Sequence, residues 1–201
     1  MAIDVIDQMD EFTTLVNNAS NKKLNLMLHN GSYAHARILF NKILEHATDT
    51  VSLISQECTE DFYGQKSVKQ SFLSFIERTQ GEGKIRIILE SQNTEQNLKE
   101  NSFLKELLFS YKSKGHTDSL EVYSLVDNNS IKISGNLSHM LLVDKGPYRF
   151  ESHLQTDKSH SELLNTPTDA IANFGDIENS QKLWDFFEIQ RTKKSTKASL
   201  L

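Results

Sequence analysis

The sequence predicts an α/β domain with a mixed, largely parallel central sheet and helices on both faces. Three observations lead to this expectation. Apolar runs of strand length alternate with longer segments in which apolar residues recur at helical spacing. A Gly-Pro pair at 146–147 separates two strand-like segments and predicts one antiparallel hairpin. The length of 201 residues suits one domain with a sizeable core.

Helical spacing predicts four helices before residue 116. The clearest begins behind Ser32, a favoured N-cap residue, and repeats apolar side chains at intervals of three and four. Gly81 and Gly83 are expected to stop the third helix and Gly115 the fourth, since glycine readily adopts the backbone conformation of a helix end. The four helices are expected at 1–19, 33–47, 68–76 and 98–114.

Short apolar segments between these helices predict the strands. The segment 84–90 is rich in β-branched residues and is therefore expected at the centre of the sheet. Asp176 is expected to cap a last helix whose aromatic residues pack on the sheet. Strands are expected at 24–29, 51–55, 84–90, 119–126 and 169–174, with a turn at 127–130 and a polar loop at 155–168.

Composition excludes several classes of protein. The single cysteine, Cys58, rules out an internal disulfide, and no apolar run is long enough to cross a membrane. The first nine residues carry two aspartates and no basic residue, unlike a signal peptide, so a cytoplasmic location is expected. No cofactor is expected, and no metal, because the spacing of His153, Asp157 and His160 matches no strong zinc pattern.

The charge distribution predicts one domain and a tail. The net charge of -5 does not favour tight non-specific binding to nucleic acid, although a local basic patch would still permit it. The segment 191–197 carries four positive charges and no negative one. We therefore expect a single domain at 1–190 and a basic, flexible tail at 191–201.

The hairpin segment 137–154, with the sequence LSHMLLVDKGPYRFESHL, resembles a known active site. The resemblance is to the phospholipase D superfamily, whose pattern is His-x-Lys-x4-Asp-x6-Gly-Ser-x-Asn. With Asp144 on the aspartate of the pattern, Ser152 falls on the serine without a gap. The resemblance covers about 137–190 well, and 32–126 only by the order of elements.

This alignment lacks the nucleophile of the family. Leu137 occupies the histidine position and His139 the lysine position, while Glu151 and Leu154 occupy the glycine and asparagine positions. In the family the histidine attacks phosphorus, and an aliphatic side chain has no lone pair for that step. The resemblance therefore implies a catalytically degenerate protein.

An alternative alignment keeps a nucleophile. With His139 on the family's histidine, Leu141 falls on the lysine and Gly146 on the aspartate. This alignment loses two motif residues and shifts the hairpin. It leaves open an active, metal-independent phosphodiesterase or nuclease in which His139 and Glu151 are the catalytic residues.

The candidate ligand-binding residues are His139, Asp144, Arg149 and Ser152. His139 and Glu151 lie at corresponding ends of adjacent strands, where a carboxylate raises the pKa of an imidazole and favours a cation that binds phosphate. Arg149 shares a face with Glu151, as a phosphate-binding fork or as one half of a structural ion pair.

Three functions remain open from the sequence. The first is a binding or regulatory module for a phosphodiester, a nucleotide or a protein partner, and the second is the active enzyme. The third is an inert dimeric interaction module without a membrane contact. Because the motif occurs once, the resemblance implies a homodimer in which two hairpins meet across a two-fold axis.

Overall fold

A computed structural model describes residues 2–90, 99–125, 132–133, 136–153, 169–193 and 195–198. Its helices are α1 (Ala2–Asn21), α2 (Tyr33–Glu45), α3 (Glu60–Tyr63), α4 (Lys66–Arg78), α6 (Ser102–Lys114) and α8 (Ile177–Lys193). Its strands are β1 (Leu28–Asn30), β2 (Thr50–Ser55), β3 (Lys84–Leu89), β4 (Leu120–Leu125), β5 (Lys132–Ile133), β6 (Asn136–Val143), β7 (Tyr148–His153), β8 (Asp169–Asn173) and β9 (Ser195–Lys197).

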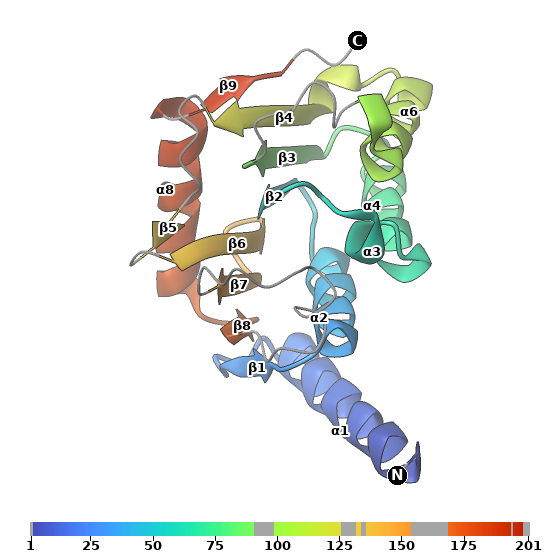
Figure 1. The fold of residues 1–201 in the computed structure, drawn as a ribbon, viewed down its shortest axis with the longest axis vertical. Helices are drawn as coiled ribbons and strands as arrows, with labels where there is room; N and C mark the ends of the chain where they lie inside the picture. Colours follow the sequence, from blue (N-terminus) through green and yellow to red (C-terminus); the bar gives the residue numbers. More distant parts are fainter. Residues whose placement is uncertain are drawn as a thin grey trace.

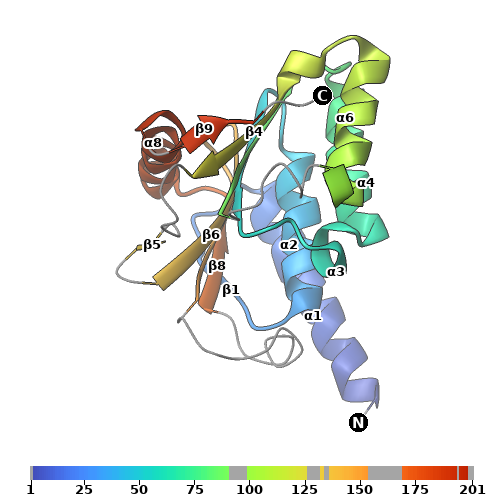
Figure 2. The same ribbon diagram turned by 45° about the horizontal axis from the view of Figure 1, so that its top comes forward.

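The strands form one mixed sheet in the order β1-β8-β7-β6-β2-β3-β4-β9, with β5 beside β6. Helices α1, α2, α3, α4 and α6 lie on one face and α8 on the other, as Figures 1 and 2 show. The expected α/β class, with helices on both faces of a mixed sheet, is confirmed. None of the described helices is both long and apolar enough for a membrane span.

The share of parallel pairing is smaller than expected. Among the described strands, only β2–β3 and β3–β4 are parallel, and the other pairs are antiparallel. Parallel neighbours need a crossover of a dozen or more residues, whereas a short turn forces antiparallel pairing. The tight turn between β6 and β7 therefore reverses the chain, and β8 and β1 continue the antiparallel half.

Alternate residues of the central strands enter two separate cores. Leu53 and Ile87 pack beneath the layer of α1, α2, α4 and α6. Ile54 and Ile88 pack against α8, where Phe187 is fully buried and Trp184 and Phe186 lie at the margin. Successive residues of a strand point to opposite faces of the sheet. Because both faces of β2 and β3 are covered by helices, residues pointing either way are apolar and the sequence shows a run instead of an alternation.

Local capping signals act as the sequence predicts. The Ser32 hydroxyl accepts a hydrogen bond from the His35 backbone N–H at 3.2 Å. Gly115 ends α6 in the left-handed conformation at φ 79°, and the Asp176 carboxylate accepts from the Asn179 backbone N–H at 3.1 Å. Each of these contacts spans at most three residues and is decided locally.

Several boundaries differ from expectation. The expected strand at 24–29 is β1 at Leu28–Asn30, and the short helix α3 was not expected. The fourth expected helix corresponds to α6, which begins at Ser102 behind the N-cap Asn101 rather than at residue 98. The expected turn at 127–130 and the loop at 155–168 lie outside the described residues.

The hairpin turn uses different residues from those expected. Asp144 and Lys145 adopt positive φ values of 49° and 54°, whereas Gly146 does not. The Gly146 N–H donates to the Val143 carbonyl at 2.8 Å and closes the turn. Two successive left-handed residues match the right-handed twist of a hairpin, and aspartate tolerates that conformation better than most residues.

The expectation of a flexible tail from residue 191 is wrong for its described part. Helix α8 continues to Lys193, and β9 pairs antiparallel with β4. Arg191 donates to Glu188 Oε2 at 2.7 Å and to the Tyr123 hydroxyl at 3.2 Å. The edge of β4 offers unpaired backbone groups that the chain end satisfies, which the composition of the segment does not reveal.

Candidate functional site

The hairpin brings three of the residues predicted from the sequence together. His139 lies directly opposite Glu151 in the β6–β7 ladder, and Arg149 lies two residues before Glu151 on the same strand. Opposite residues of an antiparallel pair, and residues two apart on one strand, share a face of the sheet. All three therefore lie on the face covered by α2, beside the carboxyl end of β2.

Arg149 and Glu151 form a buried ion pair. Arg149 Nη1 lies 2.6 Å from Glu151 Oε2, and the two side chains are 5% and 10% exposed. Arg149 Nε donates to Asn30 Oδ1 at 3.1 Å, and the guanidinium carbon lies 5.6 Å from the centre of the Phe40 ring. A buried charge needs both a counter-charge and hydrogen bonds, and these neighbours supply them.

Two tyrosines complete this cluster. Burial raises the pKa of Tyr33, and the negative charges of Glu151 and Asp61 act in the same direction while Arg149 opposes them. Burial also raises the pKa of Tyr63, against a hydrogen bond with Ser55. Both phenols stay protonated at neutral pH and offer hydroxyl donors. We call Asn30, Tyr33, Tyr63, His139, Arg149 and Glu151 the hairpin cluster.

Sequence reasoning missed the members of the hairpin cluster that lie outside the hairpin. Asn30 ends β1, Tyr33 begins α2, and Tyr63 ends α3. The only local signal was the Ser32 cap, which places Tyr33 at the first turn of a helix. The approach of Asn30 and Tyr33 to Arg149 depends on β1 pairing with β8 and β8 with β7, and that of Tyr63 on the packing of α3 against α2, and no local pattern indicates either.

Asp144 lies at the turn end of the hairpin and not in the hairpin cluster. Its carboxylate accepts from the Thr48 hydroxyl at 2.9 Å and from the backbone N–H groups of Asp49 and Thr50 at 3.0 and 2.6 Å. The Thr48 backbone N–H also donates to it. Asp144 thus ties the hairpin turn to the segment that enters β2, which is a structural role.

The remaining motif positions are placed only by their backbone. Leu137 pairs with His153, and Ser152 with Ser138, in the β6–β7 ladder. The side chains of Leu137 and Ser152 lie outside the described part of the structure, as does Leu154. The predicted role of Ser152 therefore stays a prediction.

The described residues contain no group of three or more histidine, cysteine, aspartate or glutamate side chains that could hold a metal ion. Cys58 is free and buried, and burial raises the pKa of its thiol to about 12. A thiol in that state is a poor nucleophile at neutral pH, because the thiolate is the reactive form.

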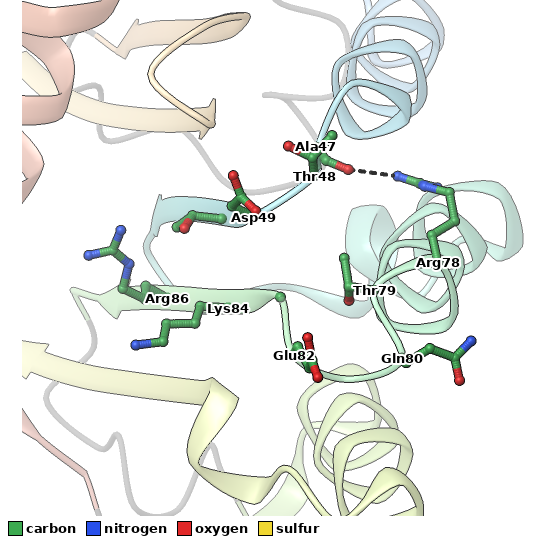
Figure 3. Close-up of a pocket in the computed structure, with 11 residues that line it drawn as sticks. Ala47, Thr48, Asp49, Arg78, Thr79, Gln80, Glu82, Lys84 and Arg86 are labelled. Atoms are coloured by element: carbon green, nitrogen blue, oxygen red, sulfur yellow. Dashed lines mark hydrogen bonds between the residues drawn. The ribbon is translucent and has the colours of Figure 1, made fainter.

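An open groove of about 940 Å³ lies at the other end of the parallel strands, where β2 and β3 begin. Figure 3 shows Arg78 on one side of it and Lys84 and Arg86 on the other. Arg78 donates to the carbonyls of Leu44 and Ala47 at 2.8 and 3.2 Å and thereby holds the end of α2. The groove and the hairpin cluster therefore occupy opposite ends of the sheet.

Comparisons with known proteins find likeness in the fold alone. No protein-family model matches the sequence, and no curated protein matches it significantly. A solved structure of TrmBL2, an archaeal chromatin protein with a novel mode of DNA binding, is similar with a TM-score of 0.56 and 13% identity. The match covers 98% of this chain and 65% of that one.

A second similar structure is phosphatidylserine synthase from Haemophilus influenzae Rd KW20, a phospholipase D-superfamily protein. Its TM-score is 0.52 at 9% identity, over 86% of this chain and 39% of that one. This chain thus spans less than two thirds of either neighbour. What the two neighbours share with this chain is the fold, a mixed α/β sheet flanked by helices.

Proposed function

We propose that this chain is a binding module with a phospholipase D-like fold that recognises a phosphate-bearing ligand without hydrolysing it. The observation that carries the proposal is the buried Arg149–Glu151 ion pair on the same face as His139. In the alignment set by Asp144, the position of the attacking histidine holds Leu137. A leucine cannot form a covalent bond to phosphorus.

The chemistry of the hairpin cluster suits anion recognition. Arg149 is a permanent cation with five N–H donors in a planar fork, and Glu151 and Asn30 each accept one of them. These two acceptors fix the orientation of the guanidinium. The protonated phenols of Tyr33 and Tyr63 add donors of neutral charge. A phosphate oxygen is the acceptor that such a set matches.

The DNA-binding archaeal neighbour supports nucleic acid as one class of phosphodiester ligand. The phosphatidylserine synthase neighbour is an enzyme and in that respect supports the rival hypothesis of an active enzyme. In that hypothesis the alternative alignment makes His139 the nucleophile at a dimer interface. We favour binding because Glu151 occupies the position directly opposite His139 and is already engaged by Arg149.

One experiment separates binding from catalysis. Purified protein is titrated with nucleoside monophosphates and a dinucleotide by calorimetry, and is also incubated with a chromogenic phosphodiester in the presence of a chelator. We expect saturable binding and no turnover. The double variant Arg149→Met/Glu151→Leu should stay folded and lose binding, since both charges disappear together.

The matched control is Lys69→Met/Glu106→Leu, which removes an ion pair of 2.7 Å between α4 and α6. It should bind like the wild type. Turnover that His139→Ala abolishes would establish the enzyme and overturn the proposal. Equal binding by both double variants would remove the hairpin cluster from recognition.

A further inference from the structure

A second charged surface lies on the opposite face of the sheet, around α8. It contains five cations and one tryptophan, which we call the α8 strip: Lys84, Arg86, Lys145, Trp184, Arg191 and Lys193. The hairpin cluster lies on the α2 face, so the two surfaces are separated by the sheet itself (Figure 2).

Two cations lie against the Trp184 ring. The guanidinium carbon of Arg86 is 4.8 Å from the centre of the Trp184 ring, and Lys145 Nζ is 5.4 Å from it. Arg86 comes from β3, Trp184 from α8 and Lys145 from the β6–β7 turn. Three distant segments of the chain therefore assemble one aromatic and cationic centre.

The strip continues across the sheet toward β9. Glu188 accepts from Arg86 Nη1 at 2.6 Å and from Arg191 Nη2 at 2.7 Å. The Arg191 guanidinium lies 5.7 Å from the centre of the Tyr123 ring. From β6 to β9 are four strand spacings, roughly 19 Å, so the strip is long enough for a chain of phosphates and not only for one.

The cations of the strip exceed their acidic partners, since Glu121, the neighbour of Arg86 on β4, is paired with Lys197. Glu188 serves two arginines, whereas the exposed Lys84, Lys145 and Lys193 form no ion pair with any described residue. Arg86 Nε is buried and makes no hydrogen bond within the described part of the chain. Docking of α8 on the sheet explains the two arginines, Glu188 and the contact of Lys145 with Trp184, but it gives Lys84 and Lys193 no role.

The acidic net charge of the chain does not oppose this local excess. Helix α1 carries four acidic residues and no basic one, and it lies in the helix layer on the other side of the sheet (Figure 2). Interactions between exposed charges are screened beyond about 8–10 Å at physiological salt. The α8 strip therefore carries a local positive charge although the net charge of the chain is negative.

We propose that the α8 strip binds single-stranded nucleic acid. The cations would contact successive phosphates, and a base would stack on the half-buried Trp184 ring in place of the exposed, flexible Lys145 side chain. Lys84 and Arg86 also line the open groove in Figure 3, together with Arg78 and the carboxylates of Asp49 and Glu82, and the groove leaves room for the backbone on the side of the cations. The combination of aromatic and basic side chains distinguishes this ligand from a duplex, whose bases are not available for stacking.

The test measures the anisotropy of a labelled oligothymidylate of about 20 nucleotides at about 50 mM salt. The charge-reversal variant Lys84→Glu/Lys145→Glu/Lys193→Glu should bind roughly tenfold or more weakly. The slope of log affinity against log salt should also become shallower by about 2, because three phosphate contacts are lost.

The matched control is Lys66→Glu/Lys105→Glu/Lys112→Glu, which reverses three exposed charges on α4 and α6 in the helix layer. This control should keep most of the affinity. Trp184 is the only tryptophan of the chain, so its emission reports directly on stacking and should be quenched on binding. Trp184 lies on the α8 face and Arg149 on the α2 face, so quenching of the Trp184 emission reports on the α8 strip and not on the hairpin cluster.

Three results would overturn the proposal. They are no saturable binding by the wild-type protein at low salt, an equal loss of affinity in both triple variants, and binding that leaves the Trp184 emission unchanged. Preference for a duplex of the same length over the single strand would also contradict it, because stacking on Trp184 requires unpaired bases.

Discussion

Arg149 and Glu151 belong to the same strand, yet their side chains meet at 2.6 Å. Phe150 between them packs against the α8 core, so its two neighbours both point into the opposite layer. The alternation of a β-strand thus places a cation and an anion side by side beneath α2. Because both side chains are buried there, removal of one charge leaves the other without its counter-charge.

Removal of one partner of this pair should be far more damaging than removal of both. Arg149→Met or Glu151→Leu leaves a buried charge unpaired and should lower the free energy of unfolding by about 3–5 kcal/mol. The double variant should lie within about 1–2 kcal/mol of the wild type. Urea unfolding of all four proteins gives the coupling energy. Additive effects of the two substitutions would mean that the pair contributes no coupling.

The carboxylate of Asp144 should matter more for stability than its backbone conformation. Asp144→Gly relieves the positive φ but removes the acceptor for Thr48, Asp49 and Thr50, so we expect a loss of roughly 2–4 kcal/mol. Lys145→Gly at the neighbouring positive φ is the control, with a change of about 1 kcal/mol or less. Urea midpoints of the two variants decide the question. Equal effects would assign the role to the turn and not to the carboxylate.

Gly175 is expected to tolerate no side chain. A Cβ there would lie 2.1 Å from the Lys23 carbonyl oxygen and 2.8 Å from the Asn25 nitrogen, and both are backbone atoms. Gly175→Ala should therefore lower the free energy of unfolding by roughly 1–3 kcal/mol or more, because the added methyl group pushes the β8–α8 connection away from the segment that follows α1. A Cβ added at Gly31 would have nothing within 4 Å of it. Gly31→Ala should shift the thermal midpoint little, and a similar loss in both variants would contradict the packing argument.

Stability should fall as the pH is lowered from neutrality, in part through His46. Burial lowers its pKa, Lys23 and Lys42 act in the same direction, and Glu45 opposes them. The unfolded chain therefore takes up the proton first, near pH 6.5. The stability that neutral His46 contributes is full above that pH and is lost as the pH falls through the lower folded pKa.

The check is urea unfolding at about pH 7.5 and pH 5.5. His46→Gln should show a smaller drop between the two values than the wild type does. His29→Gln, at an exposed position of β1, serves as the control and should retain the full drop. If His46→Gln shows the same drop as the wild type, other groups cause the pH dependence. His35 is one such group, because burial lowers its pKa as well.

Features that depend on a few neighbouring residues could be predicted from the sequence. The caps at Ser32, Gly115 and Asp176 are examples, as is the register that sets His139 opposite Glu151. Each follows from hydrogen bonds or alternation within one helix end or one hairpin. The α/β class followed in the same way, from the periodicity of the apolar residues.

The sequence by itself thus determined the longer helices and the central strands, three of the caps and the pairing of the hairpin, but not α3 or β9. Only the tertiary structure decided that Asp144 holds Thr48, 96 positions away, and that Arg149 reaches Asn30 across 119 positions. It also decided that β9 closes an edge and that Lys145, Trp184 and Arg86 meet. Contacts of this kind arise only when separate elements pack together, because no local periodicity or capping rule encodes which distant surfaces a side chain will meet.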